Sequence, residues 1–265
     1  MSNAAQGAEL PSNTCKVCGM PSLFFGETDV LRKYLVQYFR CERCGFIQTE
    51  APYWLEEAYS SAIAMQDVGI MQRNLANREI TSAVLTLLFP KMSGAIDFGG
   101  GHGVFVRLMR DRGFNFFWSD LHATNDYALG FESNEGSTYD FLTAFEVLEH
   151  LTDPVADLSK LMSLSDNVFV STCIVPQPAP RLSDWWYYVP TTGQHIAFYT
   201  TESLNILAAR FERNLLSVGP YHLFTREPKS GFLYRLATSS RIARIVNHMY
   251  RRPSMVESDF QQMTR

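Results

Sequence analysis

Four of the five cysteines form two short pairs, Cys15–Cys18 and Cys41–Cys44, each with two residues between its members. Two such pairs of thiolates can surround one Zn²⁺ ion as a tetrahedron. Gly19 and Gly45 directly follow the pairs and suit the tight turn that each pair needs. Because four protein ligands leave no open coordination position, the pattern predicts a structural Zn²⁺. Four buried cysteines without a metal are the alternative.

A glycine-rich segment follows the apolar run at 95–98 and carries Asp97, Gly99, Gly101 and Gly103. A dinucleotide fingerprint needs Gly-x-Gly-x-x-Gly, and this segment does not have that spacing. Its leading carboxylate disfavours a phosphate and suits a positively charged ligand. Asp120, at the end of the next predicted strand, can accept two ribose hydroxyls. The alternative is that the glycines make a tight turn and Asp120 caps a helix.

Three further side chains could move a proton or polarise a substrate. His195 is the first candidate for a general base, because imidazole titrates near neutral pH. Its alternative role is a hydrogen bond to the backbone within a loop. His150 and Glu146 follow the predicted strand that ends at Phe145, so we expect them at the ligand-binding edge as further catalytic candidates, with Phe145 beside the cofactor. A structural role for His150 stays equally open.

Alternating strand and helix patterns predict the frame that positions these residues. The pattern is typical of an α/β fold, and we predict a Rossmann-like, doubly wound, mostly parallel seven-stranded sheet with a small N-terminal zinc-ribbon-like module. The predicted strands are 95–98, 114–120, 139–145, 167–172, 213–218 and 221–226, and the predicted helices are 53–89, 104–112, 153–162 and 201–211. The expected divisions are a tail and zinc module at 1–50, a helical connector at 51–92, a ligand-binding domain at 93–230 and a helical tail at 231–265.

Two segments lie outside this frame. The aromatic cluster at 185–188, Trp-Trp-Tyr-Tyr, could stack on a sugar or nucleobase, or could anchor a proline-rich loop to the core. The segment 241–252 is predicted to be a docking helix with an apolar face formed by Ile242, Ile245, Val246 and Met249. Contact with a membrane surface or a partner protein is its alternative role.

The composition narrows the class of partner. Hydrophobic residues make up 46% of the chain and charged residues 19%, so a sizeable core is expected. The net charge of −4 disfavours nucleic acid as a partner, because binding phosphates needs a basic surface. The sequence shows neither a signal-peptide pattern nor an apolar run near the ~18 residues of a membrane span. We therefore expect a cytoplasmic protein, in which paired cysteines hold metal more often than they form disulfides.

Together these motifs resemble those of a known family, the zinc-containing class I methyltransferases that act on sugar nucleotides and related small molecules. Gln194 departs from the family pattern, which commonly has glutamate before the histidine. The resemblance covers about residues 15–225 and rests on the cysteine pairs with Gly45-Phe46-Ile47-Gln48, on Tyr59, on the glycine loop, on 145–151 with Asp153-Pro154, and on 194–200.

The resemblance implies S-adenosyl-L-methionine as cofactor at Asp97, Gly99, Gly101, Gly103, Asp120 and Phe145. It implies a small-molecule acceptor, a sugar or sugar nucleotide of glycan or natural-product biosynthesis. An RNA or protein methyltransferase that holds its substrate with the zinc module is the competing hypothesis. The acidic balance of the chain argues against it. A degenerate, non-enzymatic binding domain is a third hypothesis, disfavoured by the intact glycine loop and its two acids.

Overall fold

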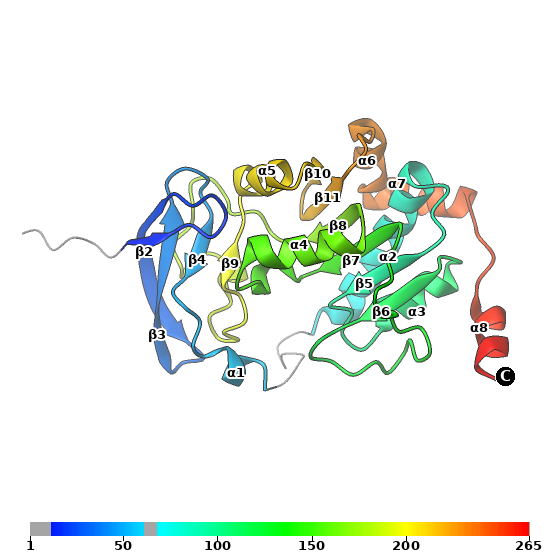
Figure 1. Ribbon diagram of the computed structural model, residues 1–265, viewed down its shortest axis with the longest axis horizontal. Coiled ribbons are helices and arrows are strands. Elements are labelled where there is room, and N and C mark those ends of the chain that lie inside the picture. The colour runs from blue at the N-terminus through cyan, green and yellow to red at the C-terminus, as the bar shows by residue number, and fades with distance from the viewer. Residues whose placement is uncertain (1–11, 61–67, 265) are drawn as a thin grey trace, which may run out of the picture.

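The computed structural model describes residues 12–60 and 68–264, and its centre is a six-stranded sheet (Figure 1). Four neighbouring strands are parallel. The two strands nearest the C-terminus extend this sheet through antiparallel pairs, one pairing with the parallel set and the other with the first. This arrangement confirms the mostly parallel α/β prediction. In spatial order the strands are β10 (Asn214–Val218), β11 (Tyr221–Thr225), β8 (Asn167–Ser171), β7 (Phe141–Phe145), β5 (Ala95–Phe98) and β6 (Phe116–Ser119).

Helices cover both faces of this sheet because successive strand residues point to opposite sides. Ala95 and Phe141 belong to one apolar cluster, whereas their chain neighbours Ile96 and Leu142 belong to another. The first cluster packs under α2 (Ile70–Leu88), α3 (Val104–Asp111), α6 (Gly231–Ala237) and α7 (Ser240–Met249), and the second under α4 (Pro154–Leu164) and α5 (Thr201–Arg210).

A second sheet is built mainly by the N-terminal segment (Figure 1). All its strand pairs are antiparallel. Its last strand comes from far along the chain, so this sheet extends past the boundary predicted at residue 50. In spatial order the strands are β1 (Ser12–Thr14), β2 (Pro21–Val30), β3 (Tyr34–Cys41), β4 (Ile47–Thr49) and β9 (Ala197–Phe198).

The central sheet has six strands in the described residues, so the predicted count of seven is corrected. The segment after β6 forms only an isolated parallel bridge, between Trp118 and Glu132, and does not extend into a strand. The predicted helix 53–89 is also corrected, because it consists of a short α1 (Leu55–Ala58) and the long α2. Part of the intervening segment, and residues 1–11 of the predicted tail, lie outside the described residues.

The C-terminal tail is helical, as predicted, but the apolar face of α7 is different. Val246 is buried, whereas Ile245 and Met249 are exposed. Asn247 is buried instead, and its amide donates to the backbone carbonyl of Glu79 in α2. The last helix, α8 (Val256–Met263), follows. Among the described residues, no helix is long and apolar enough to cross a membrane.

Candidate functional site

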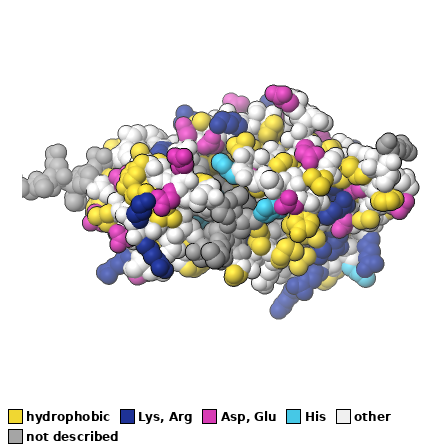
Figure 2. Space-filling view, turned by 90° about the horizontal axis from the view of Figure 1, so that it is seen from below, with side chains coloured by type: hydrophobic (Ala, Val, Ile, Leu, Met, Phe, Trp, Pro, Cys, Tyr) yellow, Lys and Arg dark blue, Asp and Glu magenta, His cyan; other side chains and the backbone are white. Residues whose placement is uncertain are grey.

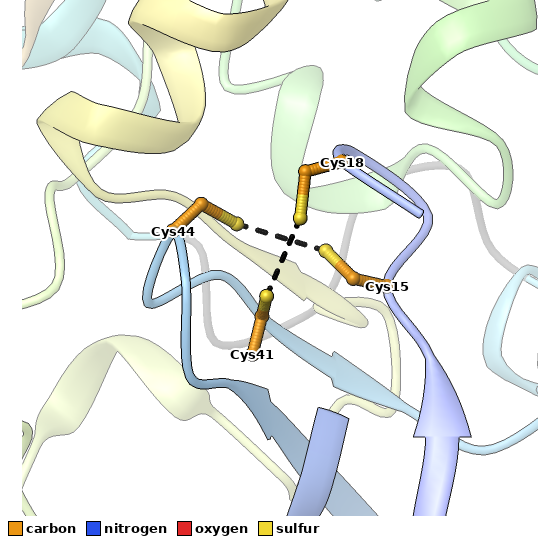
Figure 3. A group of neighbouring side chains, drawn as sticks. All are labelled: Cys15, Cys18, Cys41 and Cys44. Atoms are coloured by element: carbon orange, nitrogen blue, oxygen red, sulfur yellow. Dashed lines mark hydrogen bonds between the residues drawn. The ribbon is translucent and has the colours of Figure 1, made fainter. Parts of the chain in front are cut away.

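The four paired cysteines converge at one point of the N-terminal sheet, as Figure 3 shows. The Sγ atoms of Cys15 and Cys44 are 3.6 Å apart, and those of Cys18 and Cys41 are 3.4 Å apart. Four sulfurs bound tetrahedrally to Zn²⁺ at about 2.3 Å would be roughly 3.8 Å apart. These separations are far longer than a disulfide bond and close to those of a metal-bound tetrahedron.

Two matching turns aim the thiols at this point. Gly19 donates its N–H to the carbonyl of Cys15, and Gly45 donates to the carbonyl of Cys41, both at 2.9 Å. Both glycines have positive φ, of 74° and 69°, which other residues adopt only with strain. Interaction with the Cys44 thiol lowers the pKa of Cys15 to about 5, so this residue is the readiest to become a thiolate. The donor set is that of a structural zinc.

The glycine loop connects β5 to α3 at the carboxyl edge of the central sheet. Gly99, Gly101 and Gly103 all have positive φ. A Cβ at Gly99 would lie 2.7 Å from the side chain of Val147, so the loop packs against the segment after β7. A Cβ at Gly101 would meet no atom within 4 Å. The loop therefore presents backbone to open space at Gly101, as a ligand-binding loop requires.

Asp97, at the start of this loop, is 4% exposed. Its Oδ1 accepts a hydrogen bond of 2.6 Å from the Thr143 hydroxyl. Burial raises the pKa of Asp97 to about 7, and the nearby charge of Asp120 adds to the increase. Two neighbouring carboxyl groups of which one is buried form a site that a positively charged ligand would stabilise.

Asp120 follows β6 and is tied to the same loop. Its Oδ2 accepts from the N–H of Gly101 at 2.9 Å, and its Oδ1 accepts from the N–H groups of His122 and Ala123. These bonds hold the Asp120 carboxylate against the glycine loop at Gly101. A carboxylate offers about four lone-pair positions, so at least one remains for a hydroxyl of a ligand.

His150 and His195 lie side by side, with ring centroids 4.9 Å apart. The Nδ1 of His195 is 2.8 Å from the carbonyl oxygen of Tyr187, and the Nδ1 of His150 is 3.0 Å from that of Gln194. A carbonyl can only accept, so each Nδ1 that bonds to one carries the proton and leaves the lone pair on Nε2. The Tyr59 hydroxyl, which also lies at the Nδ1 of His150, is then an acceptor. Burial lowers the pKa of His150 to about 3 and also lowers that of His195, so both rings are neutral near pH 7.

Two carboxyl groups, of Glu146 and Glu149, complete this cluster. Burial raises the pKa of each to about 7, and the proximity of Glu149 adds to the shift at Glu146. The positive charge of Arg73 opposes both shifts only in part. Glu146 has a positive φ of 53° and accepts a 2.6 Å hydrogen bond from Ser171. Strained backbone of this kind at a non-glycine residue is concentrated at functional sites.

Tyr59 links this cluster to the glycine loop. Its hydroxyl is 2.9 Å from the Nδ1 of His150, and its ring stacks on His122 with the centroids 5.1 Å apart. His122 in turn donates its backbone N–H to Asp120. The two histidines, the carboxyls of Glu146 and Glu149, and the glycine loop with its acids thus form one continuous site at the carboxyl edge of the sheet.

Residues 71–218, more than half of the chain, match the protein family described as "Methyltransferase domain". The chain belongs to this family. It is an S-adenosylmethionine-dependent methyltransferase. No curated protein sequence matches it.

Several solved structures are similar to this methyltransferase. One is an O-methyltransferase family protein from Burkholderia thailandensis, with 18% identity and a TM-score of 0.45; the match covers 64% of this chain and 66% of that one. The plantazolicin methyltransferase BpumL has 13% identity, a TM-score of 0.46 and coverage of 76% and 89%. The O-methyltransferase NcsB1 from neocarzinostatin biosynthesis has 13% identity, a TM-score of 0.46 and coverage of 66% and 61%.

The predicted catalytic candidates of this methyltransferase, His195, His150 and Glu146, are brought together in the structure. Phe145 is half-buried at the margin of the core, where its ring packs against Phe105 and Phe169. The sequence interpretation missed Glu149. Its signal was the spacing Glu-x-x-Glu-His directly after a strand, which places two acids and a histidine in one turn.

The residues of the aromatic cluster at 185–188 differ in burial, so some anchor the segment and one remains free to contact a ligand. Tyr187 and Tyr188 are fully buried in a core with Trp54 and Phe198, so they anchor the segment to the N-terminal sheet. The ring of Trp186 is 74% exposed. Tyr187 also contacts the ring of His195, with the centroids 4.8 Å apart, so the anchor positions the histidine directly.

Proposed function

We propose that this methyltransferase moves the methyl group of S-adenosylmethionine to a small molecule, a sugar or sugar nucleotide of glycan or natural-product biosynthesis. The observation that carries the proposal is the pair of neutral histidines, His150 and His195, beside the carboxyl groups of two glutamates and next to the glycine loop. Methyl transfer needs the nucleophile, the methyl group and the sulfur held in line at close range, and this juxtaposition supplies both halves of such a site.

The methyl donor is placed at the glycine loop. The loop backbone can approach the ligand closely because of Gly99, Gly101 and Gly103. Asp97 faces the positive ammonium and sulfonium groups of the donor, and Asp120 accepts its ribose hydroxyls. The proximity of the two carboxyl groups and the open space at Gly101 support this assignment. Phe145, which is half-buried, contributes by packing the end of β7 against Phe105 of α3.

His195 is the residue that activates the acceptor. Its Nε2 lone pair can take the proton of an acceptor hydroxyl while the oxygen attacks the methyl carbon and the C–S electron pair returns to sulfur. A positioned base of this kind contributes about 10²–10⁴-fold to rate. The carbonyl of Tyr187 fixes the ring of His195 in the required tautomer.

The cysteine centre holds a structural zinc in this proposal. The Cys41–Cys44 turn leads into β4, which pairs with β9 through Ile47 and Phe198, three residues after His195. The hydroxyl of Thr200, which caps α5, also donates to the carbonyl of Cys44. The metal therefore supports the segment that carries the histidine. A reducing compartment such as the cytoplasm would keep the thiols available for metal.

Two observations favour a small acceptor over RNA or protein. The exposed Trp186 ring lies next to Tyr187, with the centroids 5.3 Å apart, and could stack on a sugar face. On the face drawn in Figure 2, basic and acidic side chains of the described residues lie among one another. Binding the phosphate backbone of RNA calls for a more continuous basic surface.

The test is a screen of sugar nucleotides with labelled S-adenosylmethionine, with products followed by mass spectrometry. We expect one acceptor to gain a single methyl group. His195→Ala should lower turnover by roughly 10²–10⁴-fold and leave cofactor affinity unchanged. The matched control is His248→Ala, an exposed histidine of α7, which should behave as wild type. Normal turnover in His195→Ala would remove this residue from the proposal.

A further inference from the structure

Glu149 is the most unusual side chain of the site. It is fully buried, and neither carboxylate oxygen has a hydrogen-bond partner among the described residues. The hydroxyls of Tyr187 and Thr172 lie close enough to oppose the rise in the pKa of Glu149, but neither makes a hydrogen bond of normal geometry to its carboxyl. A buried carboxylate without partners costs several kcal/mol. The unmet oxygens of Glu149 therefore point to a positive ligand that satisfies them.

Both neighbouring histidines have ring nitrogens suited to bind a metal ion and not to donate a hydrogen bond to Glu149. Each Nδ1 is used by a backbone carbonyl, that of Gln194 for His150 and that of Tyr187 for His195. Each Nε2 therefore keeps its lone pair and cannot donate to a carboxylate. Histidines that bind metal are oriented in this way, with the other ring nitrogen donating to a carbonyl or carboxylate.

The three groups are also close enough to share an ion. One ring nitrogen from each of His150 and His195 and one carboxylate oxygen of Glu149 all lie within 4.8 Å of one another. Glu146 lies three residues before Glu149, and its carboxyl accepts a hydrogen bond of 2.6 Å from Ser171. Two carboxyls and two neutral imidazoles together make a donor set that a dication would neutralise.

We propose that Glu149, His150 and His195 bind a divalent transition-metal ion such as Mn²⁺, with Glu146 beside it, and that its open positions hold the acceptor's oxygens. Two histidines and one carboxylate leave positions free for further oxygen ligands. The segment after β7 packs on the glycine loop through Val147 and Gly99, so the ion lies beside the methyl donor's site.

This inference rests on the proposed function and specifies how the acceptor is activated. In the metal-bound enzyme the Nε2 lone pair of His195 binds the ion and therefore no longer takes the acceptor's proton itself. His195 then activates the acceptor through the ion, which lowers the pKa of a bound hydroxyl. The hydroxyl loses its proton to water, the oxygen attacks the methyl carbon, and the C–S bond breaks with its electron pair left on sulfur. The ion would also select acceptors that present two adjacent oxygens, as a sugar diol does.

The test is a titration of the chelator-treated, zinc-loaded protein with Mn²⁺, followed by calorimetry and by electron paramagnetic resonance. Wild type should bind one Mn²⁺ beyond the cysteine centre, and Glu149→Gln should weaken this binding at least tenfold. His150→Gln is a second ligand variant with the same expectation. The matched control His248→Gln, exposed on α7, should bind as wild type. Melting curves establish that each variant is folded.

Two results would overturn the inference: no Mn²⁺ uptake by wild type, or equal affinity in wild type and in both ligand variants. Methyl transfer and S-adenosylhomocysteine binding, measured with and without chelator, separate this failure from that of the proposed function. Full activity in the metal-free enzyme would refute a role for the ion in methyl transfer and leave the proposed function unaffected. A protein that binds Mn²⁺ but does not bind S-adenosylhomocysteine contradicts the proposed function instead.

Discussion

Replacing Asp97 with asparagine should stabilise the ligand-free protein and weaken its cofactor site. The carboxyl of Asp97 is buried, with a pKa raised from 3.8 to about 7. Asparagine has nearly the same shape and can still accept the hydrogen bond from Thr143. The substitution therefore removes the charge and keeps most of the packing.

The size of the effect follows from the pKa shift. Because the folded state holds the Asp97 proton more tightly than the unfolded state, stability falls as pH rises from 3.8 towards about 7. A shift of about 3 units corresponds to roughly 4 kcal/mol, lost in full above about pH 7. Near pH 5 only about 1.6 kcal/mol of this cost is present. The stability advantage of Asp97→Asn should therefore grow by about 2–3 kcal/mol between pH 5 and pH 8.

Urea denaturation of the ligand-free protein at these two pH values measures the advantage directly. The difference between the two pH values cancels any constant effect of the asparagine amide. Asp29→Asn is the matched control, because Asp29 is an exposed aspartate of β2 in the other sheet. It should give no stabilisation at either pH. An advantage of Asp97→Asn that stays constant with pH would refute the buried, proton-binding carboxyl.

Three further outcomes are expected. Cys41→Ser should lose zinc, measured by mass spectrometry, and should lower turnover more than cofactor affinity because β4 holds β9 and the His195 segment. Asp259→Ala should lower the free energy of unfolding, measured in urea, by about 3 kcal/mol, because it leaves the buried guanidinium of Arg110 without its carboxylate. The control Glu257→Ala, at an exposed position of the same helix, should change this free energy little. Trp186→Ala should raise the acceptor KM in steady-state assays and leave the melting temperature unchanged, since its ring is largely exposed.

Elements with strong local signals were predicted well. The helix at 153–162 begins where Asp153 caps it and Pro154 occupies its first turn, and it appears as α4. Thr200 caps α5 through a capping box with Ser203. The strand β5 was predicted from a short apolar run before glycines. In each case the contacts that define the element join residues close together in the chain, so the local sequence predicts them.

Features that depend on distant partners were not predicted. The strand β9 has two residues, and only its pairing with β4, about 150 positions earlier, makes it a strand. The apolar face of α7 was misplaced because its packing against α2 buries Val246 and Asn247 and leaves Ile245 exposed. The burial of Glu149 likewise arises from segments that meet only in three dimensions, which local pattern cannot report.

The central claim is that the glycine loop and its two acids bind S-adenosylmethionine. Calorimetric titration of the zinc-loaded protein with S-adenosylhomocysteine tests it most directly. The account predicts one binding site in wild type and at least tenfold weaker binding in Asp120→Ala, measured at a temperature where melting curves show the variant to be folded. Absence of binding to wild type, or equal affinity in the two proteins, would contradict it.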